Sequence, residues 1–138
     1  MHKHIYASGF LYSSVSEKIL LHNTSSSANI SFNLFSKKCS ESADIKLAFQ
    51  KIIYEEIGIT IPISLITHVY DYHHEETHVN QSIFYSNISE LDSEDKFKIS
   101  GTTEWFTSKQ LTKLKLPKQI SHDIMIGQRV IRANSTEQ

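Results

Sequence analysis

The stretch that most constrains the fold lies between residues 42 and 59. Its apolar side chains recur at the three- and four-residue spacing of an amphipathic helix: Ile45, Ala48, Phe49, Ile52, Ile53 and Ile57. Ser42 suits the N-cap position, because its hydroxyl can accept a hydrogen bond from a free backbone N–H. Gly58 suits the left-handed position that follows a C-cap. The sequence therefore predicts one helix here, with one face buried against a core.

The segments on either side of this helix carry the alternation and the β-branched and aromatic residues of strands. Expected strands cover residues 4–13, 18–24, 30–35, 61–73, 78–88 and 104–107. The strands at 61–73 and 78–88 face each other across a short turn and predict a hairpin. Two more helices are expected, at 108–114 and 121–132, followed by a frayed tail at 133–138. Because strands and helices are interspersed without strict alternation, the predicted class is α+β or a mixed-sheet α/β sandwich.

Composition limits the domain count and the cellular setting. A chain of 138 residues with 39% hydrophobic content can bury one core, so residues 1–138 are expected to form a single domain. Its 14 Lys and Arg against 15 Asp and Glu give a net charge of -1, which argues against general nucleic-acid binding. The single Cys39 excludes an internal disulfide and favours a reducing setting. With neither a signal-peptide pattern nor an apolar run of membrane-spanning length, we expect a cytoplasmic protein without membrane contact.

Two adjacent carboxylates, Glu55 and Glu56, stand in the last turn of the predicted helix. The partial negative charge of a helix C-terminus disfavours them by ~0.3 to 1 kcal/mol each. Lys51, four residues before Glu55, can offset part of this cost through a side-chain pair. A bound cation is the other way to neutralise them.

The end of this helix also resembles a known signature. The sequence EEIGI is similar to the end of the Nudix hydrolase signature, G-x5-E-x7-R-E-U-x-E-E-x-G-U, where U is aliphatic. Glu55, Glu56, Gly58 and Ile59 fill the final positions, and Ile53 fills the preceding aliphatic one. The upstream FNLFSKK and the downstream TEWFTSKQLTKL resemble the flanking stretches of that family. The resemblance covers nearly the whole chain in order, and it implies an α/β/α sandwich with a mixed β-sheet.

Several signature positions differ from the family pattern. The arginine position holds Lys51, and the glutamate after it is Ile52. The isolated upstream glutamate falls on Ala43, and the two glycines fall on Ser36 and Lys37. Isoleucine offers no oxygen ligand, and lysine cannot make the planar two-point contact of arginine. A weakened metal site and a changed turn before the helix are therefore expected.

By resemblance, the chain is a metal-dependent pyrophosphohydrolase of a nucleoside diphosphate-linked or nucleoside triphosphate-type compound. Glu55 and Glu56 would be catalytic and would hold Mg²⁺ or Mn²⁺, with a further carboxylate from a later loop, where we select Glu94. Glu90, Asp92 and Asp95 lie in the same loop. Candidate substrate-binding residues are Lys37, Lys38 and Lys51, although a solvated surface pair is the ordinary interpretation of Lys37 and Lys38. The expected partner is a small-molecule nucleotide, and the resemblance also allows a homodimer.

Two other functions stay open at this point. The lost carboxylates are equally consistent with a Nudix-fold module that binds a ligand or a protein without turnover. The sequence YHHEETH groups His73, His74 and His78 around the hairpin turn, where imidazoles could hold zinc, nickel or copper. A polar turn without a ligand is the simpler interpretation, because no fixed ligand spacing is matched. By resemblance, contact with the substrate is a third interpretation, since loops next to a Nudix helix commonly shape the pocket.

The remaining aromatic and polar residues have structural interpretations. Trp105 and Phe106 are expected in the core or at its edge. Tyrosines at 70, 72 and 85 either pack against neighbours or offer a base-stacking surface. His122 and Asp123, at the start of the last expected helix, are predicted to be capping and surface residues. We expect no Ser-His-Asp or Cys-His catalytic arrangement, and Cys39 is assigned to a polar loop.

Overall fold

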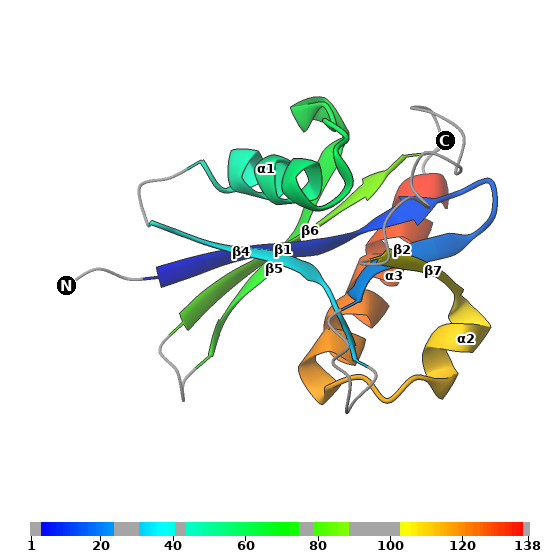
Figure 1. The fold of residues 1–138 in the computed structure, drawn as a ribbon. Helices are drawn as coiled ribbons and strands as arrows, with labels where there is room; N and C mark the ends of the chain where they lie inside the picture. Colours follow the sequence, from blue (N-terminus) through cyan, green and yellow to red (C-terminus); the bar gives the residue numbers. More distant parts are fainter. Residues whose placement is uncertain (1–3, 24–30, 41–43, 75–78, 89–102, 137–138) are drawn as a thin grey trace.

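A computed structural model describes residues 4–23, 31–40, 44–74, 79–88 and 103–136. These residues form one mixed sheet of seven strands with three α-helices (Figure 1). The strands are β1 His4–Ser13, β2 Lys18–Asn23, β3 Phe32–Asn33, β4 Phe35–Ser40, β5 Ile66–His74, β6 Val79–Asn87 and β7 Thr103–Thr107. The helices are α1 Ile45–Ile57, α2 Ser108–Lys113 and α3 Lys118–Thr136, and a short 3-10 turn, η1, covers Ile63–Leu65.

Strand β1 organises the sheet. It runs parallel to β6 along one edge, and its other edge is shared by β4 and then by β2, both antiparallel. Strands β5 and β6 form the predicted antiparallel hairpin, while β7 and β3 pair with β2. The sheet is therefore mixed, as the sequence indicated, with one parallel pair at its centre.

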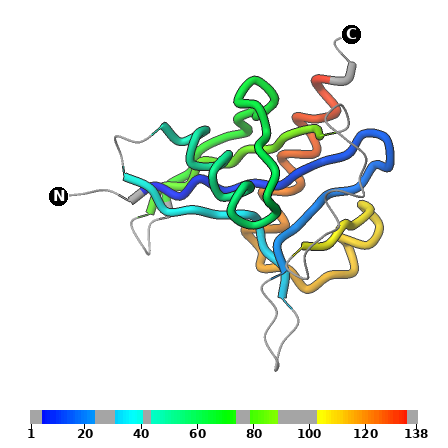
Figure 2. The backbone as a smooth tube through the Cα atoms, turned by 45° about the horizontal axis from the view of Figure 1, so that its top comes forward, coloured from blue at the N-terminus to red at the C-terminus, as the bar shows by residue number. Residues whose placement is uncertain are grey.

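The helices cover the two faces of this sheet. Helix α1 lies across β1 and β4 on one face, and α2 and α3 lie on the other (Figures 1 and 2). Phe49 and Ile53 of α1 enter the first hydrophobic cluster, whereas Ile124 and Ile131 of α3 enter the second. The strands contribute to both clusters because successive side chains point to opposite faces. The result is a three-layer α/β/α sandwich.

Gly9 allows close packing at the centre of the sheet. A Cβ atom at this position would lie 2.1 Å from the carbonyl oxygen of Phe84 and 2.8 Å from the ring of Phe49. The absence of a side chain therefore lets α1 approach the β1–β6 pair closely.

Helix α1 is bounded almost as predicted. Its N-cap is Asp44, whose carboxylate accepts a hydrogen bond from the Leu47 N–H at 3.2 Å; the predicted cap, Ser42, lies outside the described residues. Gly58 has φ 74° and donates its N–H to the Tyr54 carbonyl at 2.8 Å. The glycine stop is confirmed, and it fixes where the final turn of α1 ends.

The predicted strand at 30–35 and the predicted turn after it are wrong in detail. The strand divides at Leu34, which is buried, and β4 continues to Ser40 through residues assigned to a loop. Ser36 and Lys37 pair with Ser8 and Ala7 of β1. The open edge of β1 satisfies the backbone groups of this polar stretch, so it forms a ladder rather than a turn. Cys39 belongs to β4 and is half-buried, and its thiol lies 3.2 Å from the Ile5 carbonyl oxygen.

Two further boundaries differ from the sequence prediction. Strand β5 starts at Ile66 rather than 61, because Pro62 cannot donate to a ladder and leads into the 3-10 turn η1. Helix α3 starts at Lys118, directly after Pro117, which suits the start of a helix. It continues to Thr136 through most of the predicted tail, and Asn134 Nδ2 donates to the Tyr85 hydroxyl at 2.9 Å. No helix in the described ranges is long and apolar enough to span a bilayer.

Candidate functional site

Glu55 and Glu56 each contact a basic side chain from the sheet. Lys37 Nζ of β4 lies 2.7 Å from Glu55 Oε1, and His22 Nε2 of β2 lies 3.1 Å from Glu56 Oε2. Neither partner is close in sequence to the glutamates. The tertiary structure therefore supplies the compensation that the charge of the helix end requires.

His22 is held in place by an aromatic neighbour. Its ring stacks on that of Phe35 with centroids 5.6 Å apart and an interplanar angle of 9°. Phe35 is fully buried, so the imidazole rests on a fixed surface and presents Nε2 to Glu56. This positioning role was not predicted, because His22 resembles an ordinary strand residue in the sequence.

The candidate lysines separate into different environments. Lys37 points to the α1 side of β4, whereas Lys38 is exposed and, by strand alternation, points to the opposite face. The structure therefore brings only Lys37 to the glutamates. Lys51 is exposed on α1, and Glu55 forms its ion pair with Lys37 rather than with Lys51. The expected pair within the helix is replaced by a pair between helix and strand.

Ile52 occupies the signature position that would carry a third carboxylate. It is partly buried and packs against the first hydrophobic cluster. Its side chain therefore helps to seat α1 on the sheet instead of offering an oxygen ligand.

Several predicted residues lie outside the described part of the chain. Glu94 and its neighbours Glu90, Asp92 and Asp95 are among them, so the third ligand stays a prediction. In the described ranges, no group of three or more His, Cys, Asp or Glu side chains could hold a metal ion. A site built only from protein ligands is therefore not formed by those residues.

Glu55 and Glu56 nevertheless fit a substrate-bound Mg²⁺ or Mn²⁺. Mg²⁺ usually keeps several waters and takes one or two carboxylates together with substrate phosphates. The Glu55 side chain is 52% exposed, and that of Glu56 is 25% exposed. Both carboxylates are thus accessible to a hydrated cation, at the cost of exchanging their present contacts with Lys37 and His22.

The histidines of the hairpin turn are only partly described. His78 lies outside the described residues, and His74 pairs across the hairpin with Val79. His73 is exposed, and its Nδ1 lies 2.8 Å from the Asn80 side-chain oxygen. The transition-metal site at this turn stays a prediction.

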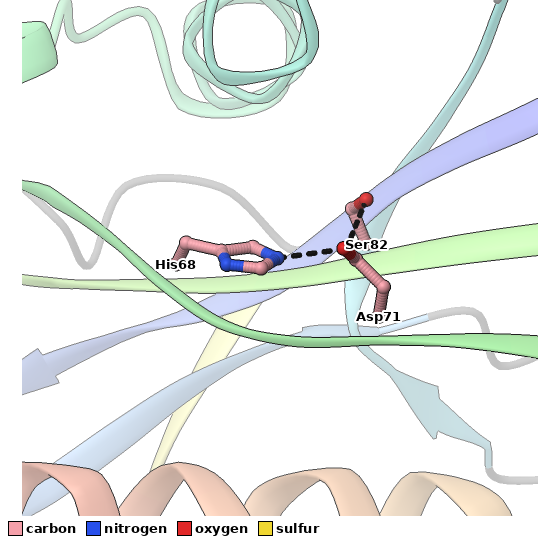
Figure 3. A network of polar contacts seen from close by, with 3 residues as sticks. All are labelled: His68, Asp71 and Ser82. Carbon is pink, nitrogen blue, oxygen red and sulfur yellow. Dashed lines mark hydrogen bonds and ion pairs between the residues drawn. The ribbon is translucent and has the colours of Figure 1, made fainter.

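A polar network that the sequence did not reveal joins β5 to β6. Asp71 Oδ1 accepts a hydrogen bond from Ser82 Oγ at 2.5 Å and lies 2.7 Å from His68 Nε2 (Figure 3). Burial raises the pKa of Asp71, but the contacts with Ser82 and His68 outweigh it and hold the pKa below its ordinary value. In a nucleophilic triad the imidazole stands between serine and carboxylate, whereas here the carboxylate stands between the other two. The network therefore binds the two strands together and does not activate Ser82.

Asp123 corrects a prediction made from the sequence. It was assigned to the surface but is 1% exposed, and its Oδ1 accepts from the Tyr70 hydroxyl at 2.5 Å and from Gln119 Nε2 at 2.9 Å. Because α3 starts earlier than predicted, Asp123 falls in its second turn and faces β5. Burial raises the pKa of Asp123, and burial together with Asp123 raises that of Tyr72 to about 12. The hydrogen bond between Asp123 and Tyr70 connects α3 to β5, on the face of the sheet opposite Glu55.

The aromatic residues mostly pack. Phe106 and Tyr85 are buried, and Trp105 is packed at the edge of the first cluster, so the core assignment of Trp105 and Phe106 is confirmed. Tyr70 and Tyr72 are half-buried against each other, with ring centroids 5.6 Å apart.

Comparison with solved structures gives extensive matches at low sequence identity. A MutT/Nudix family protein from Listeria innocua superposes with a TM-score of 0.65 and 12% identity, over 99% of this chain and 97% of that one. The Nudix domain of Shewanella oneidensis NrtR, solved with ADP-ribose, gives a TM-score of 0.69 and 10% identity, over 94% of this chain and 88% of that one. The C-terminal domain of mouse MUTYH, solved with human PCNA, gives a TM-score of 0.68 and 9% identity, over 94% of this chain and 90% of that one. No protein-family model and no curated protein sequence matches the chain.

Proposed function

Because the chain has the Nudix fold that its sequence indicated, we propose that it is a metal-dependent hydrolase of a nucleotide phosphoanhydride. One observation carries this proposal: two accessible carboxylates and a lysine converge at the last turn of α1. Carboxylates suit a divalent cation, and the lysine suits a phosphate oxygen. Such groups can hold a cation against a phosphoanhydride and neutralise part of its charge.

Each residue of the group has a proposed role. Glu55 and Glu56 hold Mg²⁺ or Mn²⁺, and Lys37 turns from Glu55 to a phosphate of the substrate. His22, fixed by Phe35, orients the Glu56 carboxylate. The bound cation supplies charge neutralisation at the phosphate oxygens and a water molecule of lowered pKa.

The proposed substrate is a nucleoside diphosphate-linked or nucleoside triphosphate-type compound. The complex of the NrtR domain with ADP-ribose supports this class, because that ligand joins a nucleoside to a second group through a phosphoanhydride. We place the reaction in the cytoplasm, in keeping with the single Cys39.

A second candidate is ligand or partner binding without turnover. It is favoured by Ile52, which replaces a carboxylate with a packing residue, and by the contacts with Lys37 and His22 that already engage the two glutamates. Such a module would keep the nucleotide pocket or a protein-binding surface and lose the reaction.

Metal titration combined with mutation separates the two functions. Thermal stability and hydrolysis of a mixed nucleotide panel are followed as Mg²⁺ or Mn²⁺ is added to the wild type and to the Glu55→Gln/Glu56→Gln variant. The control is Glu104→Gln, which removes an exposed carboxylate on β7. Hydrolysis is expected in the wild type and the control and should be lost in the double variant. Nucleotide binding by all three proteins with no hydrolysis would instead establish the binding module.

A further inference from the structure

The surface of α2 and α3 has an uneven charge distribution. Residues 108–134 contain six basic residues: Lys109, Lys113, Lys115, Lys118, Arg129 and Arg132. All six are exposed, whereas the one acidic residue of this range, Asp123, is 1% exposed. A chain with a net charge of -1 therefore presents a surface here whose formal charges are all positive.

Helix α3 arranges part of this charge in a line. Lys118, His122, Met125, Arg129 and Arg132 are exposed and follow the spacing of a single helix face. The opposite face carries Ile124 and Ile131 into the second hydrophobic cluster. Met125 stands in the middle of the basic line with 40% of its surface exposed. The line is thus basic at both ends and apolar at its centre.

Three hollows that share lining residues adjoin one another, one between α2 and α3 and one on either side of it, where residues of the sheet complete the wall. The central one has a volume of about 280 Å³, and its apolar wall consists of Leu111, Leu116, Ile124 and Met125. A hollow of about 210 Å³ shares Leu116 with it and is bordered by Lys113 and Lys115. A third, of about 260 Å³, shares Ser108, Gln128 and Arg132 with the central one. We call this feature the α2–α3 groove.

We propose that the α2–α3 groove docks an acidic peptide segment of another protein, with an apolar side chain of that segment seated in the central hollow. Lys113 and Lys115 at one end and Arg132 at the other are placed to meet carboxylates on either side of this anchor. The flexible thioether of Met125 can adapt to the anchor. Apolar burial supplies affinity, and the charges select the partner and speed its association.

The shape of the groove favours a peptide over other polyanions. A single-stranded nucleic acid usually gains affinity by stacking successive bases on aromatic rings, whereas the central hollow has no aromatic residue and the outer hollows have one each, Phe32 and Tyr12. An anionic membrane binds apolar side chains that project outward. The four apolar side chains of the central hollow, Leu111, Leu116, Ile124 and Met125, instead line a concavity. Glu17 lines the third hollow beside Arg132, so the most basic part of the groove is its α2 end.

This surface is separate from the proposed hydrolase site. The glutamates belong to α1 on one face of the sheet, and the groove lies with α2 and α3 on the other face (Figure 1). Peptide binding can therefore be measured independently of metal and nucleotide.

The test is titration of the full chain with a fluorescent peptide in which Asp and Glu residues flank a Leu and a Phe, followed by anisotropy. Lys113→Glu/Lys115→Glu is compared with Lys46→Glu/Lys51→Glu, which reverses the same amount of charge on α1. The groove variant is expected to bind at least about tenfold more weakly, and the α1 variant within about twofold of wild type. A peptide with serine in place of Leu and Phe should lose affinity to a similar degree.

Three results would overturn the proposal. The first is no binding of the peptide by the wild type. The second is equal weakening by both double variants, which would show attraction to net charge alone. The third is tighter binding of a single-stranded oligonucleotide or of vesicles of anionic lipid, weakened by the same groove variant. Circular dichroism of each variant confirms that a lost signal does not arise from unfolding.

Discussion

Lys37 Nζ and Glu55 Oε1 lie 2.7 Å apart and connect β4 to the last turn of α1. In the free protein this ion pair occupies a carboxylate and a lysine that the proposed reaction uses for metal and phosphate. The ion pair therefore competes with both the metal and the phosphate. Removing Lys37 should thus have opposite effects on the affinities for these two ligands.

Replacing Lys37 with Met tests this competition. Without substrate, Mg²⁺ should bind severalfold more tightly, because Glu55 no longer has to release a cation. Nucleotide should bind more weakly, because a phosphate contact is lost. Isothermal titration with each ligand alone measures both effects, and Lys38→Met, on the other face of β4, serves as the control. A fall or rise of both affinities together would contradict the assigned roles.

The same change should have little effect on folding. Lys37 and Glu55 are 33% and 52% exposed, and exposed ion pairs of this kind contribute ~0.2 to 1 kcal/mol. Urea unfolding of wild type, Lys37→Met, Glu55→Gln and the double variant gives the coupling energy. A coupling well above that range would show that the pair is structural.

Ile52→Glu should strengthen the cation site. It places a third carboxylate on the helix face of Glu55 and Glu56, since residues three and four apart are neighbours. Partial burial of Ile52 predicts a loss of about 1 to 3 kcal/mol without metal. Added Mg²⁺ should recover part of this loss and should raise the melting temperature of the variant more than that of the wild type. An equal metal response in the two proteins would argue against a site on this face.

Asp123 should make the protein less stable as pH rises. Its pKa in the folded protein is raised above the ordinary 3.8, so the folded chain binds more protons than the unfolded chain between these two values. The free energy of unfolding should therefore fall as pH increases through this interval. Asp123→Asn should remove that decrease, and urea titrations at several pH values measure it. Asp71→Asn is the opposite control, because a lowered pKa adds stability that is lost as pH falls.

Gly9→Ala should destabilise the centre of the fold. The new Cβ would meet the Phe84 carbonyl oxygen and the Phe49 ring, and the backbone cannot move away cheaply. We expect a loss of at least about 2 kcal/mol, measured by chemical unfolding. Gly58→Ala has open space around it and should cost about 1 to 2 kcal/mol, from its left-handed backbone alone. Equal losses at the two positions would show that close packing at Gly9 is not limiting.

Local pattern was sufficient for much of the fold. The periodicity of residues 45–57, the glycine after them and the alternation of the hairpin strands predicted α1, its end and the β5–β6 pair. The similarity of EEIGI and its flanking stretches to the Nudix signature identified the fold, which the solved structures confirm. These features are local because a helix face and a strand face repeat over short distances along the chain.

The tertiary structure decided which side chains meet. Nothing near Glu55 and Glu56 in sequence indicates Lys37 and His22, which arrive from β4 and β2, and nothing near Asp123 indicates Tyr70 of β5. The polar stretch 36–40 became a strand because the edge of β1 was available, and Asp123 became buried because that face of α3 packs against β5. Sequence by itself determined most of the elements, including the helix that carries the glutamates. Their charge partners depend on strand pairing and helix packing across long sequence separations, which local periodicity does not encode.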